Sequence, residues 1–224
     1  QVKNLPYNDQ VLAQTHFWIG ELTYKMGNLD EAIEHLEKYL ADPFEIGEIT
    51  KKHANYTLGY CYLKNNNYTK ALQLFTIAAD FNPFTESSPY QKDALVRLSD
   101  CQFMTKQYKQ ALKSYQKIID LGWKFEDYAN LQKAIIYGAL GLNKEKLKIL
   151  NNYDVDFSQS IYLSDARMEL ADTYTSKEQF QEAISPLSKI LTDNKATEFY
   201  PLTYYKLGIV YFNLNKNQEA LQNF

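Results

Sequence analysis

The residues best suited to chemistry in this chain are two cysteines. Cys61 lies in "LGYCYLKNNNYTKALQLF" (residues 58–75), and Cys101 lies in "LSDCQFMTKQYKQALKSY" (98–115), at the same place in the same pattern. A thiolate there could act as a nucleophile, a redox group or a metal ligand. A reactive site is seldom copied along a chain at a fixed spacing, whereas a structural repeat is. Both cysteines are therefore predicted to be small, buried apolar side chains.

The histidines and carboxylates do not complete a catalytic or metal-binding pattern. His16, His35 and His53 stand in separate predicted helices, and the sequence has neither an HExxH nor a CxxC motif. It also lacks the GxxxxGK[ST] and GxGxxG motifs of nucleotide-binding proteins and the GxSxG motif of serine hydrolases. The sequence thus predicts no metal, no cofactor and no enzymatic activity.

Composition restricts the class of partner and of fold. The chain has 224 residues, 45% of them hydrophobic, and a formal net charge of −3, so it lacks the basic surface of a nucleic-acid-binding protein. Its longest nearly uninterrupted apolar stretch, "AIIYGALGL" at 134–142, is too short to span a membrane. Only 8 glycines and 6 prolines are present, which favours helices over a turn-rich β fold. We therefore expect a helical protein without nucleic-acid binding or direct membrane insertion.

A pattern of small and large apolar residues recurs six times along the chain. We call its central residue the pivot; the pivots are Ala32, Ala71, Ala111, Lys146, Ala183 and Ala220. Twelve residues earlier is a second recurring site, the small position: Gly20, Gly59, Ser99, Ala134, Ala171 and Gly208. Four residues after the pivot comes a large apolar residue: Leu36, Phe75, Tyr115, Leu150, Leu187 and Phe224.

This spacing predicts two antiparallel helices per repeat, which approach closely where the small position meets the pivot. The predicted repeats are 13–46, 52–85, 92–125, 127–160, 164–197 and 201–224; the fourth is degenerate, with Lys133 and Lys146 at apolar positions, and the sixth is truncated. One such helix pair cannot bury its apolar face, but a stack of pairs can. We expect a single solenoid over residues 1–224.

The repeats resemble the tetratricopeptide repeat (TPR), above all in "LGYCY…Y…A…F…A…P" (58–83) and "LGIVY…A…F" (207–224). The resemblance implies an all-α fold, a right-handed superhelix of about six helix-turn-helix repeats. The stretches "SSPYQKDALVRLSDC" and "YPLTYYKLGIVYFNLNKNQEAL" are further similar to bacterial cell-envelope TPR proteins of the Tol-Pal-associated and outer-membrane-assembly types. That similarity favours a periplasmic or cell-envelope location, with the cytoplasm as the alternative.

In the TPR fold, first-helix residues that do not face the partner helix line an inner groove where ligands bind. The resemblance assigns to this groove Phe17, Glu21, Tyr24, Tyr56, Tyr60, Lys64, Asp93, Asp100, Phe103, Asp172, Tyr205 and Phe212. The same register adds Gln14, Lys25, His53, Leu63, Val96, Met104, Asp165, Met168, Thr175, Ser176, Leu202, Ile209 and Asn213. The family's clamp for a C-terminal carboxylate is missing, because its positions hold residues such as Glu21 and Tyr60. An aromatic, lightly acidic groove is expected to bind a basic or apolar segment, either extended or helical.

Two functions stay open at this point. The favoured one is a non-catalytic scaffold that binds a partner protein or peptide through the groove. The alternative is an accessory or regulatory domain of a larger enzyme or sensor protein. Because the sequence starts with Gln1 and stops at Phe224 inside a predicted helix, we expect a fragment of a longer chain whose cut ends could self-associate.

Overall fold

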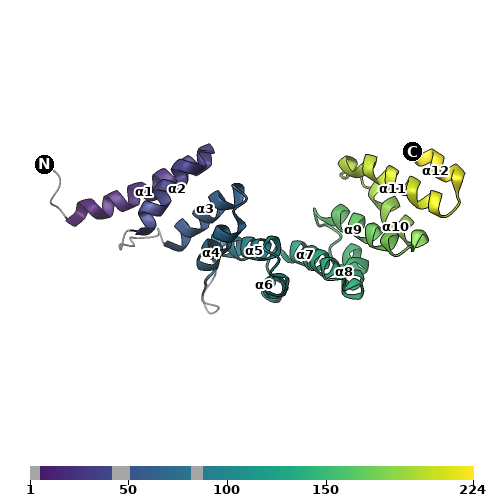
Figure 1. The fold of residues 1–224 in the computed structure, drawn as a ribbon, viewed down its shortest axis with the longest axis horizontal. Helices are drawn as coiled ribbons and strands as arrows, with labels where there is room; N and C mark the ends of the chain where they lie inside the picture. Colours follow the sequence, from purple (N-terminus) through teal and green to yellow (C-terminus); the bar gives the residue numbers. More distant parts are fainter. Residues whose placement is uncertain (1–5, 42–50, 82–87) are drawn as a thin grey trace. The chain divides into compact units, whose positions relative to one another are not determined.

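The computed structural model describes residues 6–41, 51–81 and 88–224, with side chains from residue 11 onward. These residues form twelve α-helices and one short 3₁₀ helix, with no strand among them, which confirms the all-α fold class (Figure 1). The helices are α1 (Pro6–Met26), α2 (Leu29–Ala41), α3 (Lys51–Lys64), α4 (Tyr68–Ala78), α5 (Pro89–Met104), α6 (Tyr108–Asp120), α7 (Glu126–Ala139), α8 (Asn143–Asp156), α9 (Leu163–Ser176), α10 (Phe180–Leu191), η1 (Thr197–Phe199), α11 (Tyr200–Asn213) and α12 (Asn217–Asn223).

The helices fall into two compact units, one ending at Trp123 and the other beginning at Lys124. In the first unit each helix from α1 to α6 packs on the next, and the first helices α1, α3 and α5 also touch one after another. In the second unit α7 to α12 pack in the same consecutive manner. A single solenoid running through both units stays a prediction.

The paired helices approach closely where the sequence predicts it. The pivots Ala71 and Ala111 are fully buried. A methyl group added to Gly59 on α3 would lie 2.9 Å from the ring of Phe75 on α4, and one added to Gly208 would lie 2.6 Å from the ring of Phe224. Because these distances are shorter than van der Waals contact, a larger side chain would push the two helices apart.

The first helix of every repeat ends in the same hydrogen-bonded turn. Seven residues after the small position, the backbone takes a positive φ of 57–86°, at Gly27, Asn66, Lys106, Gly141, Glu178 and Asn215. The amide of the next residue then bonds to the carbonyl five residues earlier at 2.7–2.9 Å, as from Gln107 to Gln102. This is the Schellman motif, which satisfies carbonyls at a helix end. The sequence analysis did not identify it.

The helix α5 begins with a defined cap, and the prediction that both cysteines are buried is confirmed. Ser88 caps α5 through a reciprocal capping box with Gln91, and Pro89 occupies the first turn. Cys61 and Cys101 are free thiols with no exposed surface, in equivalent places on α3 and α5. The cysteines are therefore packing residues.

The degenerate fourth repeat forms a regular helix pair, α7 and α8. Its pivot, Lys146, is buried, and its ammonium group lies 2.5 Å from Glu169 of α9. The end of its side chain lies against Gly138 of α7, where any larger residue would collide with it. A paired charge and a long stem thus allow a lysine at an apolar position. None of the described helices is long and apolar enough to cross a membrane.

Candidate functional site

In the first unit, several predicted groove residues form one hydrogen-bonded network between α3 and α5. The hydroxyl of Tyr56 donates to Asp93 Oδ2 at 2.9 Å, and the hydroxyl of Tyr60 donates to the same oxygen. Arg97 bonds through Nη1 to Asp100 Oδ2 at 2.6 Å and through Nη2 to Asp93 Oδ1 at 3.4 Å. All five side chains are half-buried. The structure therefore brings together four of the predicted residues and adds Arg97, which the sequence analysis missed.

Burial and charge in this network keep its two tyrosines protonated. Burial, reinforced by the Asp93 carboxylate, raises the pKa of Tyr56 and of Tyr60 far above their usual value, so both phenols stay protonated donors. Asp100 also accepts a hydrogen bond from Tyr115, a fully buried residue of α6. Arg97 lies between the two aspartates and compensates one of their two negative charges, while the tyrosine hydroxyls donate hydrogen bonds to both carboxylates.

The remaining predicted residues of the first unit are arranged around this network. Glu21 accepts a hydrogen bond from Thr57, and the ammonium group of Lys64 lies 4.3 Å from the ring centre of Tyr24. Phe103 is half-buried beside Tyr108, with ring centres 5.8 Å apart.

Phe17 does not line an accessible surface. It is 0% exposed and packs against Tyr39 and His53. The prediction of Phe17 as a binding residue is therefore wrong. The physical reason is that α2 and α3 cover it from two sides, through Tyr39 and His53. Val96, which the same register assigns to the groove, is also fully buried, so that prediction is wrong as well.

The second unit carries a hollow of about 400 Å³ on its first-helix face. It is lined by Leu131, Gln132, Ile135, Tyr162, Asp165, Met168, Glu169, Phe199 and Leu202, from α7, the start of α9, η1 and α11. The sequence register placed three of these in the groove: Asp165, Met168 and Leu202. The α7 residues were missed because no groove positions were assigned in the degenerate repeat.

The other predicted residues of the second unit lie on the same helices. Asp172 of α9 accepts a hydrogen bond from Lys206 Nζ of α11 at 2.5 Å. Tyr205 and Phe212 of α11 are 57% and 62% exposed. Large aromatic side chains with that much free surface are typical of protein-binding faces.

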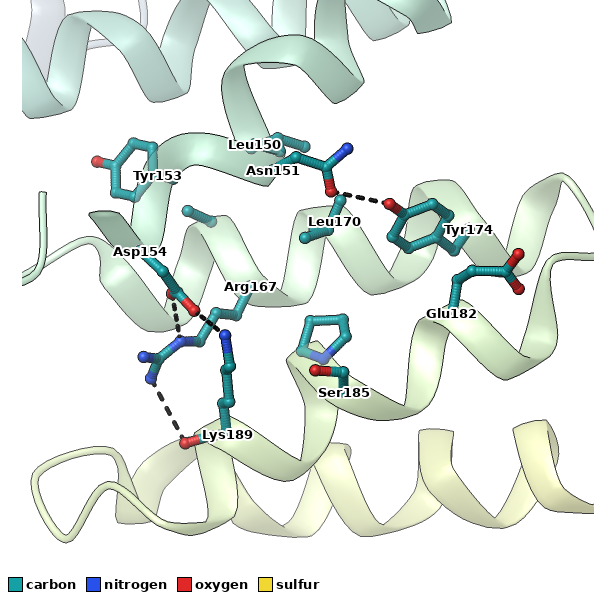
Figure 2. A pocket seen from close by; sticks show the side chains of 12 residues that line it. Leu150, Asn151, Tyr153, Asp154, Arg167, Leu170, Tyr174, Glu182, Ser185 and Lys189 are labelled. Atoms are coloured by element: carbon teal, nitrogen blue, oxygen red, sulfur yellow. Dashed lines mark hydrogen bonds and ion pairs between the residues drawn. The ribbon is translucent and has the colours of Figure 1, made fainter. Parts of the chain in front are cut away.

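A smaller cavity of about 160 Å³ lies between α8, α9 and α10 (Figure 2). At one end, Asp154 Oδ1 accepts from Arg167 Nε at 2.8 Å, and Asp154 Oδ2 accepts from Lys189 Nζ at 2.5 Å. Burial acts to raise the pKa of Asp154, but the hydrogen bonds from Lys189 and Arg167 outweigh it and lower that pKa. At the other end, Tyr174 donates to Asn151. Because its charged groups pair with one another, we interpret this cavity as a junction that joins three helices.

The part of the chain that the structure describes shows no cluster of side chains typical of a catalytic or metal site. Among the residues that the structure describes, no group of three or more histidine, cysteine, aspartate or glutamate side chains could hold a metal ion. His16 and His35 meet through their Nδ1 atoms at 2.8 Å and form one hydrogen-bonded pair between α1 and α2.

Comparisons with known proteins agree with this architecture. Residues 20–86 match one model of the tetratricopeptide repeat and residues 93–121 match another, so these two stretches of the first unit are similar to that repeat. A comparison with curated protein sequences finds no match.

Solved structures extend the likeness over most of the chain. MamA from Desulfovibrio magneticus is 14% identical, with 83% of this chain and 96% of that chain covered and a TM-score of 0.66. A tetratricopeptide repeat protein from Parabacteroides merdae is 19% identical over 97% and 77%, with a TM-score of 0.63. YrrB, described as a TPR protein with an unusual peptide-binding site, is 18% identical over 92% and 89%, with a TM-score of 0.57. At these identities the likeness establishes the fold.

Proposed function

We propose that this tetratricopeptide-repeat chain is a non-catalytic scaffold that binds a peptide segment of a partner protein along its first-helix face. The observation that carries the proposal is the exposed apolar surface of the second unit. Leu202, Tyr205 and Phe212 of α11 keep about half or more of their surface free, and Leu202 also lines the hollow of about 400 Å³. Exposed apolar surface of this kind suits a protein partner.

Two further points support the proposal. The similar fold of YrrB is described with a peptide-binding site, so this architecture is suited to holding peptides. The sequence similarity to cell-envelope TPR proteins supports a periplasmic or cell-envelope location for the scaffold.

The proposal can be tested by selecting peptides from a displayed random library on the whole chain. Selected peptides are then measured by fluorescence anisotropy against Tyr205→Ser and Phe212→Ser on the first-helix face. Loss of an aromatic contact is expected to weaken binding about tenfold or more. The matched control is Lys113→Glu on α6, an exposed second-helix residue, which should leave affinity unchanged.

Circular dichroism must show unchanged helicity in every variant. Peptides whose binding survives both aromatic substitutions but is lost with Lys113→Glu would place the site on the second helices and refute the proposal.

A further inference from the structure

The hollow of the second unit occupies the same repeat positions as the tyrosine–aspartate network of the first unit. Counted from the small position, Tyr56 and Tyr60 of α3 correspond to Leu131 and Ile135 of α7. In the following first helix, Asp93 of α5 corresponds to Asp165 of α9. The network of the first unit and the hollow of the second unit therefore occupy equivalent positions in the repeat but are built from different side chains.

This exchange removes every donor that the aspartate has in the first unit. Asp93 accepts from two phenols and pairs with Arg97. At Asp165 the phenols are replaced by aliphatic side chains, and the position of Arg97 holds Glu169. The Asp165 carboxylate therefore lies at the edge of an apolar space. In the first unit, the rings of Tyr56 and Tyr60 occupy the equivalent positions.

The other acidic groups of this face already have a cation. Glu169 pairs with Lys146, and Asp172 pairs with Lys206. Within residues 124–224, all of which the structure describes, neither Asp165 nor Glu198 forms an ion pair with a lysine or arginine. Partial burial and the nearby Glu198 raise the pKa of Asp165, and a hydrogen bond from its own backbone amide offsets this only in part.

We infer that the hollow binds a peptide segment that carries an aromatic side chain next to an arginine or lysine. The ring fills the space lined by Leu131, Ile135 and Leu202, and the cation pairs with Asp165. The volume of about 400 Å³ lies within the usual range for ligand pockets, roughly 300–1,000 Å³. This inference rests on the proposed function and specifies the chemistry of the partner.

The probe is a short fluorescent peptide with a central Tyr-Tyr-Arg-Arg, compared with Tyr-Tyr-Glu-Glu and Ser-Ser-Arg-Arg versions in the same flanks. Anisotropy on the whole chain is expected to show the first peptide binding about tenfold or more tightly than either control. Asp165→Asn should weaken its binding about fivefold, as expected for a partly exposed ion pair.

Asp156→Asn is the matched control for that variant. It makes the same change in net charge at an exposed residue at the end of α8, outside both the predicted groove and the hollow. The affinity of this variant for the peptide should stay within about twofold of wild type, since no contact to the peptide is lost.

A second variant tests the inference by restoring the side chain of the first unit. Ile135→Tyr places a ring at the position of Tyr60, so it should fill the hollow, donate to Asp165 and reduce peptide binding at least about tenfold. Thermal melting should show the variant folded and no less stable than wild type. If it unfolds, Leu202→Ser, at a half-exposed site, provides the alternative test of the apolar wall.

Equal affinity for the Arg and Glu peptides, or an equal loss in Asp165→Asn and Asp156→Asn, would overturn the inference. If library-selected peptides still lose binding with Phe212→Ser in that case, the proposed function stands and only the partner chemistry is wrong. If they do not, the proposed function fails as well.

Discussion

Replacing Lys106 or Glu178 with glycine is expected to stabilise the protein. Both residues occupy the left-handed turn position of their repeat, with φ of 61° and 58°, where two other repeats have Gly27 and Gly141. Both side chains are exposed. Removing them therefore costs little packing and relieves a backbone conformation that L-residues disfavour.

The magnitude follows from two opposing terms. A non-glycine residue in the left-handed helical region is disfavoured by about 1–2 kcal/mol. Glycine also makes the unfolded chain more flexible, which lowers stability by about 0.4–1 kcal/mol. The net gain is about 0.5–1 kcal/mol per site, or about 1–4 °C in Tm for a protein of this size. The two turns lie in different units, so their effects should add in the double variant.

The assay is urea unfolding followed by far-UV circular dichroism, with the midpoint rising and the slope unchanged. Lys113→Gly is the matched control: the same exchange at an exposed interior position of α6 should lower stability by about 1 kcal/mol. If Lys106→Gly lowers stability as much as Lys113→Gly, the turn does not have the backbone conformation described above and the reasoning is refuted.

Two further predictions concern the packing of the paired helices. Gly59→Ala should lower Tm, because its methyl group meets a fully buried ring at 2.9 Å and overpacking of a core typically costs about 1–3 kcal/mol, more than the helix propensity that alanine gains. Gly208→Ala should leave Tm unchanged or raise it, since the ring it meets is 65% exposed and can turn away; equal losses in both variants would contradict this. Burial raises the pKa of the Cys61 and Cys101 thiols to about 12, so a thiol reagent at pH 8 should label them slowly in the native protein and rapidly in urea. Rapid labelling of the native protein would show that they are not core residues.

The helix pairs could be predicted from the sequence because their determinants are periodic. A small residue, a pivot and a large apolar residue recur at fixed spacings, and helical geometry converts those spacings into one buried face. The groove prediction that rests on the same periodicity is wrong at Phe17. Periodicity identifies the helix face on which a residue lies, but not how much of that face the neighbouring helices bury. Lys146 was noted only as a departure from the pattern, since its partner Glu169 belongs to the next repeat.

The composition of the candidate site was harder to predict for a related reason. Arg97 shares a helix with Asp93 and Asp100, at spacings of four and three residues, so the signal for that ion pair was present in the sequence. The hollow of the second unit instead reflects an absent interaction, because Leu131 and Ile135 of α7 cannot donate a hydrogen bond to Asp165. That absence is recognised only once the structure has shown that the equivalent tyrosines of the first unit donate to Asp93.

The bonds from Tyr56 and Tyr60 to Asp93 have a consequence for how this array can evolve. They join consecutive repeats, so the second repeat requires a carboxylate at one position of its successor. Among the six repeats, only the third and the fifth have an aspartate there. A recombination event that deleted the third repeat would place Tyr128 of the fourth opposite the two phenols and leave them without an acceptor. Deletion of the third repeat would therefore remove an acceptor that the second repeat uses, so the packing of this part of the chain depends on the order of its repeats.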